Sequence, residues 1–230
     1  MRSLVLLPGF MCDADLWIDM VPDLERLGAL HFGNVYEDDS LEGMARRVLA
    51  DAPERFVLVG FSMGGFVARV LTLMAPARVA GGAFVASSAR GYSDEERTRR
   101  ISGYRPGDRP PRAAGAVSNA MGLHPDRDTD PVLLDRLRGM QRRLGPEVRK
   151  RQAALVRRDG YADLERITCP SLVVACRQDR LRTFAETERM AQALPNSSFS
   201  ILEDCGHMAP LEKPHELSAL LAAWIGRANL

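Results

Sequence analysis

Short apolar runs alternate with amphipathic segments along most of this chain. The apolar runs cover residues 3–7, 30–35, 56–59, 79–88, 171–175 and 198–202, and they read as buried strands. Between them, apolar residues recur at helical spacing, as in residues 22–27, 40–52, 63–75, 184–194 and 216–225. Strand followed by helix, repeated in this way, predicts an α/β protein with a doubly wound, mostly parallel sheet and right-handed crossovers.

The alternation stops between about residue 90 and residue 166. Strand-like runs are missing there, and residues 105–111 (Arg-Pro-Gly-Asp-Arg-Pro-Pro) connect helical pieces, of which residues 132–144 and 148–156 are the clearest. We interpret residues 91–165 as a helical cap inserted into a single domain of residues 1–230. Because open α/β sheets bind ligands beyond the carboxyl ends of their strands, we expect the cap to cover that edge.

Composition narrows the class of protein. The 230 residues are 46% hydrophobic and carry a net charge of +1 without long blocks of one sign, which argues against a nucleic-acid-binding protein. The four cysteines lack metal-ligand spacing, and no apolar run is long enough for a secretory signal or a membrane span. We therefore expect a cytoplasmic protein with reduced thiols, no metal and no membrane partner.

Charge is unevenly distributed along the chain. Residues 91–160 hold 16 basic and 10 acidic side chains, a net charge of +6, whereas the remaining residues sum to −5. One interpretation is a set of solvated helix faces. The other is that this segment meets an anionic or carrier-bound substrate. The pattern predicts no particular oligomeric state.

The sequence Gly60-Phe-Ser-Met-Gly64 joins a predicted buried strand directly to a predicted helix. This is the context of a nucleophile elbow, in which a sharp turn exposes the hydroxyl of Ser62. The first helical turn also offers the Met63 N–H to an oxyanion. A glycine-rich turn with a capping serine is the simpler alternative, so the interpretation depends on the partners of Ser62.

Two such partners follow later strands. Asp179 comes just after the run at 171–175, and His207 comes just after the run at 198–202. In a parallel sheet all three side chains would meet at one edge, in the chain order Ser, Asp, His of an α/β hydrolase. Taken singly, each could be an ordinary loop residue. The competing histidines are His31, His124 and His215, and the competing acids are Asp204, Asp159 and Asp163.

The motifs together resemble the α/β-hydrolase fold family, of the esterase, lipase and pimeloyl-ACP methyl ester esterase type. The resemblance rests on Leu-Leu-Pro-Gly-Phe10, Gly-Phe-Ser-Met-Gly-Gly65, Arg-Gln-Asp179 and Asp-Cys-Gly-His-Met-Ala-Pro-Leu-Glu-Lys-Pro214. It implies a sheet of about six strands without the family's N-terminal hairpin. It also implies that Phe10 N–H is the second oxyanion donor, with Met11 N–H as the alternative.

The implied activity is that of a serine hydrolase. His207 would take the proton of Ser62, Asp179 would stabilise the imidazolium, and no metal or organic cofactor would be needed. The expected substrate is a small carboxylic ester, and thioesters and lactones use the same groups. Alternatives are C–C bond hydrolysis or a cofactor-free lyase of the same fold, a non-catalytic small-molecule-binding protein, and an interaction module that acts through the Arg-rich helices.

Overall fold

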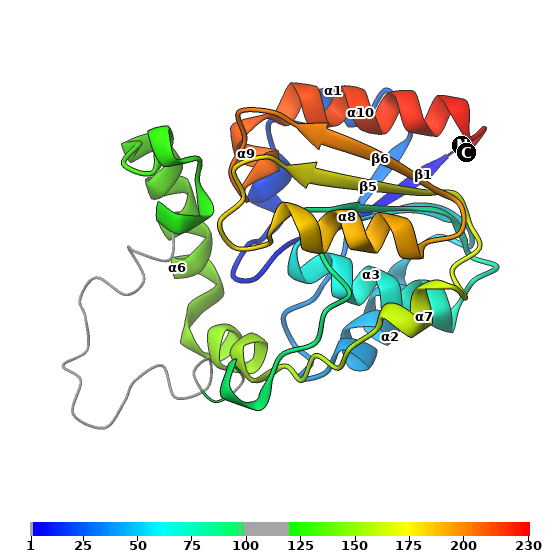
Figure 1. Ribbon diagram of the computed structural model, residues 1–230, viewed down its shortest axis with the longest axis horizontal. Helices are drawn as coiled ribbons and strands as arrows, with labels where there is room; N and C mark the ends of the chain where they lie inside the picture. Colours follow the sequence, from blue (N-terminus) through cyan, green and yellow to red (C-terminus); the bar gives the residue numbers. More distant parts are fainter. Residues whose placement is uncertain (1, 97, 99–119) are drawn as a thin grey trace.

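A computed structural model describes residues 2–96, 98 and 120–230. Its centre is a sheet of six parallel strands in the order β2-β1-β3-β4-β5-β6 (Figure 1). The strands are β1 (Ser3–Leu7), β2 (Ala29–Phe32), β3 (Phe56–Phe61), β4 (Val79–Val85), β5 (Ser171–Cys176) and β6 (Ser197–Leu202). The predicted fold class, a doubly wound parallel sheet of about six strands, is confirmed.

Helices cover both faces of this sheet (Figure 1). On one face lie α1 (Val21–Leu24) and α10 (Pro214–Arg227), and on the other lie α2 (Leu41–Asp51), α3 (Met63–Met74), α7 (Tyr161–Leu164) and α8 (Phe184–Ala193). The short elements η1 (Ala14–Trp17), η2 (Pro125–Arg127) and α9 (Ala209–Glu212) belong to loops at the carboxyl edge.

Successive residues of the inner strands contribute to two separate cores. In β1, Leu4 and Leu6 pack into the cluster below α1 and α10, whereas Val5 and Leu7 pack into the cluster with α2, α3 and α8. Because side chains alternate across a strand, a strand covered on both faces must be apolar throughout. This requirement explains why β3, at the middle of the sheet, is buried at every position.

Three predicted elements are shorter in the structure. The run at 79–88 leaves the sheet after Val85, because Ala86 has a positive φ of 46° that breaks the extended backbone. The strand predicted at 30–35 ends at Phe32. The helix predicted after Pro22 ends at Leu24, and Gly28 instead lets the backbone approach Arg2, since a Cβ there would lie 2.4 Å from the Arg2 carbonyl oxygen.

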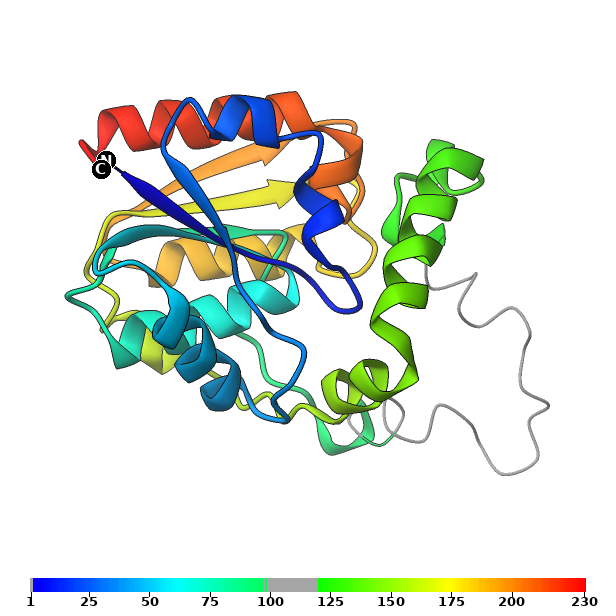
Figure 2. The same cartoon turned by 180° about the vertical axis from the view of Figure 1, so that it is seen from behind.

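The described part of the insertion is dominated by α6 (Pro131–Ala154), which lies beyond the carboxyl edge of the sheet (Figure 2). The side chain of Asp130 caps its N-terminus. Gly145, with φ of 75°, divides it into two arms, and Pro146 starts the second arm. This division matches the two helical segments predicted from the sequence. Residues 97 and 99–119 of the predicted cap lie outside the described residues.

Candidate active site

Ser62 occupies a sharp turn between β3 and α3. Its φ of 50° and ψ of −110° are unusual for a residue other than glycine, so the surrounding structure must impose them. The neighbouring glycines explain how the turn fits. A Cβ on Gly60 would lie 2.6 Å from the Gly64 carbonyl oxygen, and one on Gly64 would lie 2.2 Å from the Leu7 carbonyl oxygen. The turn therefore requires glycine at both positions.

Ser62, His207 and Asp179 form a continuous hydrogen-bonded chain. His207 Nε2 lies 2.8 Å from Ser62 Oγ, and His207 Nδ1 lies 2.7 Å from Asp179 Oδ2. Since an ionised carboxylate only accepts, Nδ1 carries the proton and Nε2 is left to accept from the hydroxyl. The three side chains come from the loops after β3, β5 and β6, as the sequence pattern predicted. They are buried, with Ser62 9% and His207 5% exposed.

Asp179 is held in position by backbone donors. Its Oδ1 accepts from Leu181 N at 2.7 Å and from Arg182 N at 2.8 Å, which leaves Oδ2 for His207. The arrangement therefore fixes the direction of the Asp179 carboxylate toward His207.

Gln178 connects the loop that carries Asp179 to the loop that carries His207. The sequence pattern did not identify this residue. Its backbone N–H donates to the Cys205 carbonyl at 2.9 Å, and its side-chain oxygen accepts from Cys205 N at 3.0 Å. The position beside Asp179 was the only available signal. A polar loop residue cannot be assigned a partner 27 positions away without the tertiary structure.

The loop after β1 runs beside Ser62. A Cβ built on Gly9 would lie 2.8 Å from the Phe61 ring and 3.4 Å from the Ser62 Cβ, so glycine lets this loop lie close to the elbow. Phe10, the predicted oxyanion donor, follows immediately. The alternative donor, Met11, has its N–H bound to Gln152 Oε1 at 2.8 Å. Met63 starts α3, where backbone N–H groups have no acceptor within the helix.

The competing residues are paired elsewhere. Asp204 contacts Arg127, Lys213 and His124. Hydrogen bonds from Lys213 and then Arg127 lower the pKa of Asp204. Asp163 pairs with Arg69, Asp159 accepts from Tyr161 N, and His215 contacts Asp23. His31 lies on the edge strand β2.

The buried thiols nearby are not rival nucleophiles. Burial, with a smaller contribution from Asp13, raises the pKa of Cys12 to about 12. The contact with Cys205, followed by burial, raises the pKa of Cys176. Because the thiolate is the reactive form, both groups are inert near neutral pH. Among the described residues, no three His, Cys, Asp or Glu side chains gather as a metal site, and no helix is both long and apolar enough to cross a membrane.

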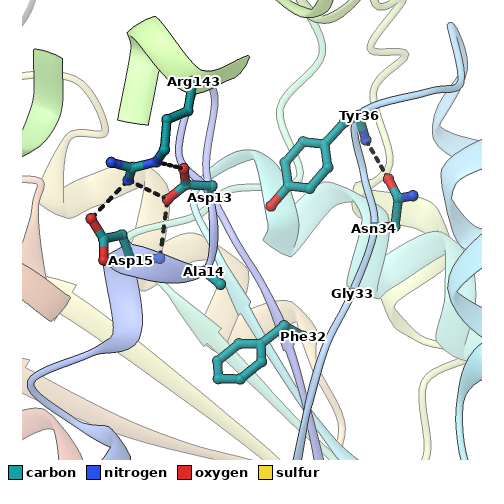
Figure 3. A pocket seen from close by; sticks show the side chains of 8 residues that line it. All are labelled: Asp13, Ala14, Asp15, Phe32, Gly33, Asn34, Tyr36 and Arg143. Atoms are coloured by element: carbon teal, nitrogen blue, oxygen red, sulfur yellow. Dashed lines mark hydrogen bonds and ion pairs between the residues drawn. The ribbon is translucent and has the colours of Figure 1, made fainter. Parts of the chain in front are cut away.

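A hollow of about 620 Å³ lies beside the start of η1, but Ser62, Asp179 and His207 do not line it. Figure 3 shows Arg143 of α6 reaching down to the carboxylates of Asp13 and Asp15 at its rim. Four apolar residues of the insertion that could line an acyl pocket do not line this hollow. Leu123, Leu137 and Met140 are buried in the core with α1 and α10, and Met121 is 40% exposed.

Residues 4–220 match the model of the alpha/beta hydrolase family. The chain is similar to a pimeloyl-[acyl-carrier protein] methyl ester esterase of Edwardsiella ictaluri, with 43% identity over 38% of this chain and 37% of the relative. The first curated relatives are thus matched over little more than a third of their length. A monoacylglycerol lipase ABHD6 of Bos taurus is 24% identical over 99% of this chain and 76% of its own.

Solved structures share the fold at lower identity. A thermophilic esterase from Thermogutta terrifontis has a TM-score of 0.84 at 23% identity, covering 100% of this chain and 91% of its own. An enol-lactonase from Burkholderia xenovorans has a TM-score of 0.85 at 20% identity, covering 98% and 91%. The family match extends over nearly the whole sheet, including the elbow and the loops of the acid and the histidine. The chain is therefore a member of the alpha/beta hydrolase family.

Proposed function

We propose that the protein is a serine hydrolase that cleaves carboxylic esters. The observation that carries this proposal is the chain of two short hydrogen bonds from Ser62 through His207 to Asp179, built on a strained elbow. The proteins to which the chain is similar include esterases, a lipase and a lactonase, which supports the same reaction class. No metal or organic cofactor enters the proposed reaction.

In the first half-reaction, Ser62 Oγ attacks the acyl carbon while its proton passes to His207 Nε2. Asp179 holds the ring and stabilises the imidazolium. When the tetrahedral intermediate collapses, the C–O bond to the alcohol breaks and His207 returns the proton to the leaving oxygen. Water then attacks the acyl carbon while His207 removes its proton. The bond between the acyl carbon and Ser62 Oγ breaks, His207 returns the proton to Ser62 Oγ, and the carboxylic acid leaves.

The backbone amides of Phe10 and Met63 are the proposed oxyanion donors. Met63 N–H lies at the positive end of α3, and Phe10 N–H belongs to the loop that runs against Ser62. The engagement of Met11 N–H by Gln152 supports Phe10 as the loop donor. Misalignment of either amide is expected to lower the rate by about a hundredfold.

We propose the insertion of residues 91–165 as a cap that shapes the acyl site of this single domain. Some basic side chains of the insertion form ion pairs with the rest of the domain: Arg136 pairs with Asp19, and Arg143 pairs with Asp13. Arg138 and Lys150 remain exposed on α6. They support a small anionic ester, or one carried on an acidic protein, as the substrate.

The first experiment is intact-protein mass spectrometry after reaction with a fluorophosphonate. We expect one label on the wild type, none on Ser62→Ala, and slow labelling of His207→Ala and Asp179→Asn. Hydrolysis of esters, thioesters, lactones and a β-diketone then separates ester cleavage from C–C bond cleavage. If the wild type reacts with none of these compounds but melts at a higher temperature with a ligand that it does not consume, that result would favour a binding protein.

A further inference from the structure

Gln152 is a fully buried polar side chain in the second arm of α6. It is 1% exposed, and both ends of its amide are used. Oε1 accepts from Met11 N at 2.8 Å, and Nε2 donates to the Val35 carbonyl at 3.1 Å. One side chain of the insertion therefore connects the loop after β1 to the loop after β2.

The bond to Met11 falls on a strained turn. Cys12 N donates to the Gly9 carbonyl at 3.2 Å, which closes a β-turn, and Met11 at its third position has φ of 54°. A positive φ at that position is the feature of a type II turn, where glycine is preferred. Without an acceptor for Met11 N–H, the central peptide could flip and let Met11 return to negative φ. Gln152 opposes this flip.

The turn is the one that carries the proposed oxyanion donor. Its first residue, Gly9, lies against Ser62, and its second residue is Phe10. The Phe10–Met11 peptide directly follows the Gly9–Phe10 peptide that carries the donor N–H, so the hydrogen bond from Met11 N to Gln152 restrains the turn immediately next to that donor. A second contact from α6 reaches this residue, since the guanidinium of Arg149 lies 5.8 Å from the Phe10 ring centre.

We propose that Gln152 is a positioning residue that holds the oxyanion turn in its active conformation. The insertion would thus contribute to transition-state stabilisation, in addition to any contact with substrate. Gln152 acts through Met11 and Phe10 and touches no reacting atom. The inference rests on the proposed serine hydrolase function, because it concerns a donor of that reaction.

Arg151 provides a matched control. It precedes Gln152 on the same helix and also binds the loop after β2, with Nε donating to the Tyr36 carbonyl at 3.0 Å. This hydrogen bond to Tyr36 does not involve the turn at residues 9–12. Arg151→Met therefore removes an attachment of α6 to the domain and leaves the acceptor of Met11 N–H in place.

The test compares Gln152→Met, Gln152→Glu and Arg151→Met by steady-state kinetics on an ester that the wild type hydrolyses, below every variant's melting temperature. In Gln152→Met the oxyanion turn should lose its alignment, which should lower kcat about tenfold to a hundredfold with little change in KM. The kcat of Arg151→Met should stay within about twofold of wild type. Gln152→Glu keeps an acceptor and should recover part of kcat. Amide hydrogen exchange at Met11 should accelerate in Gln152→Met alone.

The possible failures are distinguishable. If the wild type hydrolyses esters and Ser62 is labelled, but Gln152→Met matches Arg151→Met in kcat or changes only KM, the inference is wrong and the proposed function stands. If the wild type is neither labelled nor active, the proposed function and this inference fail together.

Discussion

Gln178 and Cys205 are joined by a pair of hydrogen bonds, one through the Gln178 backbone and one through its side chain. The pair links the loop that carries Asp179 to the loop that carries His207. The two loops that the bond between His207 and Asp179 joins are therefore joined by a second contact as well.

Replacing Gln178 by Ala should lower kcat about tenfold to a hundredfold, because small displacements of a reacting group are costly. The rate of fluorophosphonate labelling should fall in parallel. Arg177→Ala is the matched control. Arg177 joins the same loops through an exposed ion pair with Glu203, and such pairs contribute little. Equal losses in the two variants would contradict a specific role for Gln178.

Gly64→Ala should prevent folding or abolish labelling of Ser62, because the new Cβ would lie 2.2 Å from the Leu7 carbonyl oxygen. Backbone cannot move away from such a contact without disturbing β1 and α3. Gly226→Ala in α10 is the control, since nothing lies within 4 Å of its Cβ position. Alanine is the better helix former, so we expect this variant to be up to about 1 kcal/mol more stable. Urea unfolding measures the stability of both variants.

The ion pair of Arg69 and Asp163 should respond asymmetrically to mutation. The side chain of Arg69 is 6% exposed and that of Asp163 is 42% exposed. Asp163→Asn leaves a buried guanidinium without its carboxylate, which we expect to cost about 2 kcal/mol, less than for a fully buried pair. Arg69→Met leaves a carboxylate that water can reach, and should cost less. Urea unfolding of both variants gives the comparison, and the reverse order would refute this account.

The contact of His215 with Asp23 predicts a pH-dependent contribution to stability. Asp23 raises the pKa of His215 above its ordinary value of 6.5. A raised pKa in the folded state means that the contribution is complete below pH 6.5 and is lost as the pH rises through the raised value. His215→Asn should therefore melt at a slightly lower temperature than wild type at pH 5.5 and at the same temperature at pH 9. If the difference in melting temperature persists at pH 9, the contribution of His215 comes from packing and not from its charge.

Local sequence pattern determined the strands, the elbow and the helical arms of this protein. The apolar runs specify the parallel strands, and the elbow glycines are required by contacts within a few residues or with the adjacent strand. Asp179 and His207 were identifiable because a parallel sheet brings the carboxyl ends of its strands to one edge. The two arms of α6 also follow from helical spacing interrupted at Gly145.

Only the tertiary structure decided which polar residues support the site. Gln152 stands in a helix among charged residues, where polarity ordinarily indicates a solvent-facing position, yet it is buried against Met11 and Val35. Its proposed role depends on where α6 lies relative to the sheet, because Gln152 and Met11 are 141 positions apart in the sequence. Hydrophobic periodicity reports which face of an element is buried, but a hydrogen bond also needs the position and direction of its partner.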